Sequence, residues 1–268
     1  MAVALQLGST SIDVAALQST LISLGFLTGA VDGNFGPQTV QAVMAFQTSR
    51  GLPADGIVGP QTAAALSLAG APVTVPAGMP NVTVAIAAKM FPVTPVANIA
   101  ANLPPVMTAL QQAALTDLPL VLASIATIRA ETEGFVPISE GISQYNTSPG
   151  GSPFDLYDNR ADLGNQGPTD GADFRGRGYV QLTGRANYTT FGPIVGVPDL
   201  ATNPDQANDS IIAAAILAAF VQSKKAAIAA ALAADDLAAA RRLVNGGSNG
   251  LDRFTSAYRI GMQLMSPG

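Results

Sequence analysis

The chain has 268 residues, 18 of them acidic and 13 basic, with a net charge of −5 and an isoelectric point near 4.6. It contains no cysteine and no histidine, which excludes disulfides, thiolate or imidazole zinc sites and histidine-based catalytic triads. Hydrolytic chemistry must then rest on carboxylates without a metal or cofactor, and the acidic balance argues against nucleic acid as a partner.

The first residues, MAVALQLGSTSID, lack the basic start, apolar block and cleavage site of a signal peptide. We therefore expect the protein to stay in the cytoplasm in which it is made until another route releases it. The longest uninterrupted apolar run, residues 211–221, is shorter than the stretch of about 20 residues that a membrane span needs. It predicts a buried helix and no membrane insertion.

An internal repeat dominates the N-terminal region. The segment DGNFGPQT at 32–39 returns as DGIVGPQT at 55–62, with six of eight positions identical. Each copy joins an Asp-Gly turn to Gly-Pro and Gln-Thr, a pattern that opens a helix. Apolar spacing predicts helices over about 14–24 and 39–46, and residues 1–68 are predicted to form a small three-helix domain.

A sequence rich in Pro, Gly and Ala, SLAGAPVTVPAGMPNV at 67–82, is uncharged and typical of a semi-stiff linker. We therefore divide the chain into a domain over 1–68, a linker over 69–82 and a second domain over 83–268. Apolar spacing predicts helices in the second domain at about 97–115, 118–133, 209–222, 225–233 and 235–244.

Strand signals in the second domain are weak apart from residues 178–183, which are predicted to form a strand. Between residues 133 and 174 the chain is rich in Gly, Pro, Asn and Asp, and a loop of that length usually lines a binding site. The predicted fold class is mainly α, with a loop-built cleft in the larger domain.

All three glutamates of the chain fall within RAETEGFVPISEG, as Glu131, Glu133 and Glu140. A solvated helix end is the structural explanation for this cluster, and a catalytic site is the functional one. Glu131 is expected at the buried edge of the 118–133 helix, where desolvation raises the pKa of a carboxyl and suits a general acid. Glu140 lies in a following loop, where it can stay ionised and activate water. Glu133 would point about 200° away from Glu131 around the helix axis, which makes it a poor partner.

Residues 1–68 resemble the peptidoglycan-binding domain of many cell-wall hydrolases through VDGNFGPQTVQAVMAFQ and GLPADGIVGPQTAAAL. The resemblance implies that this domain binds bacterial peptidoglycan. For each single Asp, Gly or Pro in the turns, a role in building the fold is the favoured interpretation.

Residues 83–268 resemble glycoside hydrolase family 19, which contains chitinases and phage or bacterial lysozymes. The blocks IRAETEGFVPISEG, DGADFRGRGYVQLTGRANYTTFG and RRLVNGGSNGLDR occur in the family's order. The resemblance implies a lysozyme-like catalytic domain with Glu131 as general acid, Glu140 as base and Thr183 helping to hold the attacking water. It also implies sugar contacts from Gln181, Asn187 and Asn245.

Several other residues are candidates with an open alternative. Arg177 orients a catalytic carboxylate or contacts substrate, unless it stabilises the fold. Asn245 is alternatively a helix C-cap. Tyr145, Tyr157 and Tyr179 can stack on sugar faces, unless they are buried.

The chain departs from the family pattern at Ala130, where a His often precedes the catalytic Glu, and at Glu133, where a small residue is common. It also lacks Trp, which disfavours tight chitin binding through aromatic platforms. These departures put the substrate in doubt and leave the reaction type intact.

Three functions follow as hypotheses. The first is a monomeric hydrolase of the β-1,4 bonds of peptidoglycan, which inverts the anomeric carbon by direct water attack. The second keeps this mechanism and takes chitin as the substrate. The third is a non-catalytic wall-binding protein built on a decayed hydrolase. Without a signal peptide, a phage endolysin released through a permeabilised membrane or a toxin delivered by a secretion machine fits the first hypothesis.

Overall fold

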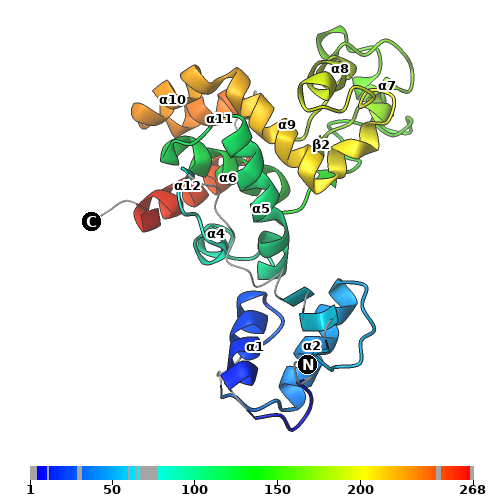
Figure 1. Ribbon diagram of the computed structural model, residues 1–268. Coiled ribbons are helices and arrows are strands. Elements are labelled where there is room, and N and C mark those ends of the chain that lie inside the picture. The colour runs from blue at the N-terminus through cyan, green and yellow to red at the C-terminus, as the bar shows by residue number, and fades with distance from the viewer. Residues whose placement is uncertain are drawn as a thin grey trace.

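The computed structural model describes residues 5–10, 12–28, 32–59, 61–63, 65–66, 78–245 and 249–265. Within these ranges the chain is mainly helical, as predicted, and its sheet consists of two short strands. Figure 1 shows the helices of the N-terminal region apart from a larger group of helices, with α9 extending from that group toward α7 and α8.

The N-terminal region has a core of its own. Helices α1 (Ile12–Ser23) and α2 (Pro37–Ser49) enclose buried apolar side chains that include Leu21, Phe35 and Phe46. Helix α2 starts at Pro37, directly after Gly36, as the Gly-Pro motif predicts. Isolated bridges from Thr10 to Asn34 and from Leu5 to Val58 tie the first residues to both repeated turns.

The first repeated turn is organised around Gln18, a buried side chain on α1. Its Nε2 donates to Asp32 Oδ1 at 2.8 Å, to the Asn34 carbonyl at 2.9 Å and to Thr39 Oγ1 at 3.2 Å. The Asn34 N–H also donates to Asp32 Oδ1, and this hydrogen bond, with that from Gln18, lowers the pKa of Asp32.

The second turn repeats this network around Gln47 on α2. Its Nε2 donates to Asp55 Oδ1 at 2.7 Å, to the Ile57 carbonyl at 3.0 Å and to Thr62 Oγ1 at 3.1 Å. The Ile57 N–H donates to Asp55 Oδ1 and lowers the pKa of that carboxyl, as in the first turn. The repeated Asp therefore helps to build the fold, which is the interpretation that the sequence favours for each Asp, Gly or Pro of the turns. The repeated Thr takes part in the same networks.

The larger part of the chain is built around helix α6 (Leu118–Thr132). Every residue from Leu120 to Ile128 is buried, so polar side chains on this helix need local partners. Ser124 Oγ and Thr127 Oγ1 donate to backbone carbonyls one turn earlier, at 2.8 and 2.9 Å. Asp117 stands at the N-cap of α6, and its side chain makes no capping hydrogen bond.

Other long helices surround α6 and share one apolar core with it. Four of them match predicted helices to within three residues at each end: α5 (Val96–Gln112), α9 (Ser210–Ser223), α10 (Lys225–Ala233) and α11 (Leu237–Asn245). Helices α4 (Val84–Met90) and α12 (Leu251–Met265) were not predicted, yet both pack in this core.

A smaller core lies under α8 (Arg185–Ile194) and one side of α9. It contains Phe174, Leu182, Tyr188, Phe191 and Leu200. The loops over it include α7 (Asp170–Asp173) and the 3-10 helices η1 (Asp155–Tyr157), η2 (Ala161–Leu163) and η3 (Pro204–Asn208). Of these loops, those with η1, η2 and α7 belong to the stretch over 133–174 that was predicted to line a binding site.

The strand prediction for 178–183 is wrong in extent. Only Arg177–Gly178 forms strand β2, which pairs antiparallel with β1 (Ile138–Ser139). Residues 179–181 form the turn of a hairpin in which Arg177 and Leu182 are joined by two backbone hydrogen bonds. Gly178 and Gln181 have φ values of +76° and +53°, and the positive φ places Gln181 in a region that non-glycine residues rarely adopt.

The N-terminal core and the larger core draw on separate parts of the sequence, residues 14–66 and 79–258. Residues 67–77, most of the predicted linker, lie outside the described ranges.

The predicted buried helix over 211–221 lies within α9, most of whose residues are buried or half-buried. No single described helix is long and apolar enough to cross a membrane. Helices α9 and α10 reach that length and apolar composition only when taken together, across a 73° bend.

Candidate active site

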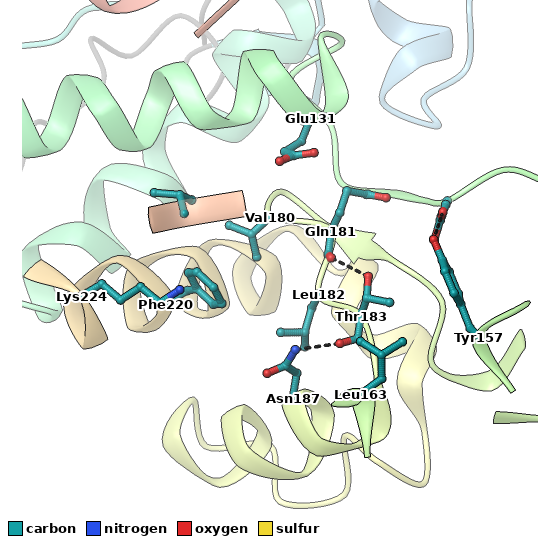
Figure 2. A pocket seen from close by; sticks show the side chains of 12 residues that line it. Glu131, Tyr157, Leu163, Val180, Gln181, Leu182, Thr183, Asn187, Phe220 and Lys224 are labelled. Atoms are coloured by element: carbon teal, nitrogen blue, oxygen red, sulfur yellow. Dashed lines mark hydrogen bonds between the residues drawn. The ribbon is translucent and has the colours of Figure 1, made fainter. Parts of the chain in front are cut away.

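A cleft of about 460 Å³ opens between the end of α6, the 177–182 hairpin and helix α9. Figure 2 shows Glu131 facing this space from α6, opposite Asn187 of α8, with Gln181 and Thr183 between them. The lining residues are Glu131, Glu140, Tyr157, Leu163, Val180, Gln181, Leu182, Thr183, Asn187, Phe220, Lys224 and Val244. Five predicted site residues, from two of the three sequence blocks, therefore meet in one cavity.

Glu131 occupies the last turn of α6 and keeps a side-chain exposure of only 11%. Arg241 of α11 donates from Nη2 to Glu131 Oε1 at 2.7 Å, and its own side chain is fully buried. The same guanidinium donates from Nε and Nη2 to the Asn249 carbonyl. The ion pair joins α6 to α11 and orients the Glu131 side chain, and the bonds to Asn249 attach both helices to the loop before α12. No local sequence pattern indicates it.

Glu140 follows strand β1, in a loop as predicted, and three donors surround its carboxylate. Oε1 accepts from Asn146 Nδ2 at 3.0 Å and from the Tyr157 hydroxyl at 2.9 Å. Oε2 accepts from the Gly176 N–H at 3.1 Å, while the Glu140 N–H donates to the Gly176 carbonyl. Because every partner is a donor, this site presents Glu140 as a hydrogen-bond acceptor.

Burial raises the pKa of Tyr157 to about 12, and the hydrogen bond to Glu140 adds to this effect. The phenol therefore remains protonated at neutral pH and continues to donate to Glu140. Asn146, the other side-chain donor, is fully buried and accepts from the Ser143 N–H. The sequence does not predict that either residue positions Glu140, and it suggests Tyr157 only as a stacking surface for a sugar.

Gly176 sits where the site's polar atoms converge. A Cβ on this residue would lie 2.8 Å from Gln181 Oε1 and 3.2 Å from both Glu140 Oε2 and Thr183 Oγ1. These three oxygens therefore surround one small space beside the Gly176 backbone. Thr183 Oγ1 itself donates to the Gln181 carbonyl at 2.9 Å, which fixes the hydroxyl near Glu140. A hydroxyl and a carboxylate facing one space can hold a water molecule between them.

Two amides extend the polar lining. Gln181 donates from Nε2 to the Ile138 and Gly178 carbonyls, at 3.0 and 3.1 Å. Asn187 donates from Nδ2 to the Thr183 carbonyl at 2.7 Å. Both amide nitrogens donate hydrogen bonds to backbone carbonyls, so each residue offers its amide oxygen as an acceptor for ligand N–H or O–H groups.

Arg177 lies outside the cleft lining, so the structure does not place it with the other predicted substrate contacts. Its side chain is 3% exposed, and Nη2 forms an ion pair with Asp205 at 2.8 Å. Nη1 donates to the Asp173 carbonyl at 2.8 Å and to the Tyr188 hydroxyl at 3.0 Å. These bonds hold α7, β2 and η3 together, which is the fold-stabilising alternative.

The predicted tyrosines separate into three environments. Tyr145 is 80% exposed and lies outside the cleft lining, so the structure does not place it with the other predicted sugar contacts. Tyr179 is buried and donates to Asn102 Oδ1 in the core. Only Tyr157 lines the cleft. Asn245 ends α11, and its side chain lies outside the described part of the chain.

Glu133 lies outside the cleft lining, although for a different reason from the expected one. The helix ends at Thr132, and Glu133 stands at the C-cap with a φ of +48°. Its carboxylate pairs with Arg253 at 3.2 Å, and both side chains are about half exposed.

The same structure, over the ranges it describes, contains no group of three or more acidic side chains arranged to hold a metal ion.

Comparison with known proteins bears mainly on the N-terminal region. Residues 10–66 match the family described as a putative peptidoglycan binding domain. This match confirms the resemblance expected for the N-terminal region.

Curated relatives match short parts of the chain. The N-acetylmuramoyl-L-alanine amidase CwlM of Mycobacterium tuberculosis is 60% identical over 50 residues, which are 19% of this chain and 12% of that protein. A spore cortex-lytic enzyme of Bacillus cereus is 48% identical over 58 residues, 22% of each chain. This chain thus spans less than a quarter of either relative.

Among solved structures, the crystal structure of the Burkholderia AP3 phage endolysin aligns with 98% of this chain and 99% of that chain. The identity is 22% and the TM-score is 0.30. An alignment with this score does not establish a shared fold.

Proposed function

We propose that this protein is a peptidoglycan hydrolase that cleaves β-1,4 glycosidic bonds, with Glu131 as general acid and Glu140 as general base. The observation that carries the proposal is that the two glutamates, from different elements, line one cleft together with Thr183 and two amides. The match of residues 10–66 to a peptidoglycan-binding family supports a wall polymer as the substrate.

The proposed reaction is a single displacement with inversion. Glu131, in its protonated form, transfers its proton to the glycosidic oxygen as the bond from that oxygen to the anomeric carbon breaks. A water molecule beside Thr183 loses a proton to Glu140, and its oxygen bonds to the anomeric carbon from the opposite face. The products are one sugar with a new hydroxyl on its anomeric carbon and one with a free hydroxyl at the former linkage. The proton gained by Glu140 returns to Glu131 through solvent.

The lining fits an aminosugar chain. The oxygens of Gln181 and Asn187 can accept hydrogen bonds from acetamido N–H and hydroxyl groups, whereas Leu163 and Val180 offer apolar surface to the ring faces. These contacts suit both peptidoglycan and chitin. The N-terminal match favours peptidoglycan.

Substrate class is tested by measuring turbidity loss of isolated bacterial walls beside product formation from chitin oligomers. The full chain is expected to lyse walls and to release little or no product from chitin at the same enzyme concentration. A higher specific activity on chitin oligomers would assign the cleft to chitin. Activity on neither substrate would favour the non-catalytic hypothesis.

Replacement of Gly176 by Ala is expected to lower the rate of wall lysis by about 10²-fold, because an added methyl displaces Glu140, Gln181 or Thr183 by a fraction of an ångström or more. The matched control is Gly141→Ala, which adds a methyl beside Glu140 where nothing lies within 4 Å. Initial rates and thermal unfolding of both variants check this. Equal rates for the two variants would contradict the assigned role of the Gly176 space.

A further inference from the structure

One cation lines the cleft among its described residues. Lys224 stands where α9 ends and α10 begins, and Figure 2 shows it with Phe220 on the opposite side of the cleft from Tyr157. Its Nζ lies 4.5 Å from the centroid of the Phe220 ring. The same Nζ donates to the Leu243 carbonyl at 2.7 Å.

These contacts hold the ammonium group in place and leave part of its bonding capacity open. An ammonium carries three N–H donors, and the Leu243 carbonyl accepts from one of them. The Phe220 face attracts the charge and fixes the direction of the side chain. Because Lys224 is only partly exposed, its charge is screened less than that of a surface lysine.

The two other charged residues in the lining are the glutamates assigned to catalysis, so Lys224 is the one described cation there. A neutral sugar chain carries no charge that would pair with this cation. Chitin is neutral along its length. Peptidoglycan carries carboxylates, either on the lactyl group of muramic acid when the stem peptide is removed, or on the stem peptide itself. A fixed ammonium in the cleft matches the feature that distinguishes these two polymers.

We propose that Lys224 binds a carboxylate of the wall glycan and is a specificity-determining residue that separates peptidoglycan from neutral aminosugar polymers. This inference rests on the proposed function. The ammonium supplies a charge-assisted hydrogen bond to the carboxylate, and the Phe220 ring keeps the lysine stem from turning away. The bond to Leu243 gives Lys224 a structural role as well, which the experiment must separate from ligand binding.

Three glycans serve as substrates for the full-length protein. The first is intact wall, whose carboxylates are on the stem peptides. The second is wall glycan stripped of its peptides by an amidase, which exposes lactyl carboxylates. The third is the stripped glycan after carbodiimide coupling to ammonia, which makes those groups neutral. Initial rates against substrate concentration give kcat and KM for each.

The variants are Lys224→Met, Lys224→Arg and Lys225→Met. Lys225 is a matched control, because its Nζ also donates to a backbone carbonyl, that of Ala114 at 2.8 Å, but it lies outside the cleft lining. Thermal unfolding of each variant reports any loss of the Leu243 bond.

Lys224→Met is expected to raise KM about tenfold on a carboxylate-bearing glycan and to leave KM on the neutral glycan unchanged. Lys224→Arg should retain most of the affinity, and Lys225→Met should match the unaltered protein throughout. An effect confined to intact wall assigns the carboxylate to the stem peptide, whereas an effect confined to stripped glycan assigns it to the lactyl group.

The same fold-change on all three glycans, or none on any, would overturn the role of Lys224 while leaving the proposed hydrolase intact. If the unaltered protein cleaves none of the glycans, the proposed function itself is wrong and the role of Lys224 is wrong with it.

Discussion

Glu140→Gln is expected to lower the rate of wall lysis by about 10² to 10⁴-fold, since an amide of the same shape cannot take a proton from water. Glu131→Gln should lose activity to a similar degree, because it removes the proton donor for the leaving sugar. Glu133→Gln is the matched control, for its carboxylate pairs with Arg253 outside the cleft. Initial rates of turbidity loss on isolated walls measure all three. A loss of the same size in Glu133→Gln would undo the assignment of roles.

The Glu131 variant needs a second control because of Arg241. Glu131→Gln removes the carboxylate that faces a fully buried guanidinium, and a buried charge without its counter-charge destabilises a protein. Loss of activity in this variant would then reflect unfolding as well as chemistry. Comparing Glu131→Gln alone with Glu131→Gln/Arg241→Met separates the two, since the double variant removes both charges. The double variant should be more stable than Glu131→Gln and equally inactive.

Arg241→Met is expected to destabilise the protein more than any other single substitution proposed for it, at about 3–5 kcal/mol of unfolding free energy. The substitution removes the guanidinium that faces the Glu131 carboxyl, whose side chain is 11% exposed. It also removes the two bonds to the Asn249 carbonyl that tie α11 to the loop before α12. Denaturant unfolding followed by circular dichroism gives the free energy.

Arg253→Met supplies the comparison, because Arg253 also pairs with a glutamate of the same segment. That pair is about half exposed on both sides, so its loss should cost about 1 kcal/mol or less. Equal unfolding free energies for the Arg241 and Arg253 variants would show that the buried pair does not organise this end of α6.

Local sequence patterns predicted the elements that local physics determines. The Gly-Pro signal placed the start of α2, and apolar spacing placed α5, α6, α9, α10 and α11. Helix α12 was missed although Phe254, Ala257, Tyr258 and Gly261 have helical spacing, because charged residues between them lower the apolar content of the segment. What decides α12 is its packing against α6, more than 100 residues earlier.

The two halves of the repeat show another limit of sequence patterns. Its turns are evident from the identical residues, but the glutamines that hold them are not part of the repeated segment. Gln18 lies 14 residues before Asp32, whereas Gln47 lies 8 residues before Asp55. Because the two spacings differ, the offset that aligns the two turns does not align the two glutamines.

For the cleft, the family resemblance indicated Glu131, Glu140, Gln181, Thr183 and Asn187, and the structure brings these five together. The residues that position them were not predicted, because their partners are distant in sequence. Arg241 is 110 residues from Glu131, and the Gly176 backbone is 36 residues from Glu140. The partner of Arg177 is distant as well, since Asp205 lies 28 residues later.

In the proposed function, two glutamates in one cleft hydrolyse a glycosidic bond. Isolated peptidoglycan digested with the full-length protein, reduced with borohydride and measured by mass spectrometry tests it most directly, because reduction marks each newly exposed reducing sugar. The account predicts disaccharide-peptide products that end in one type of reduced sugar, and none from Glu140→Gln. Products with free stem peptides and intact glycan strands would contradict it.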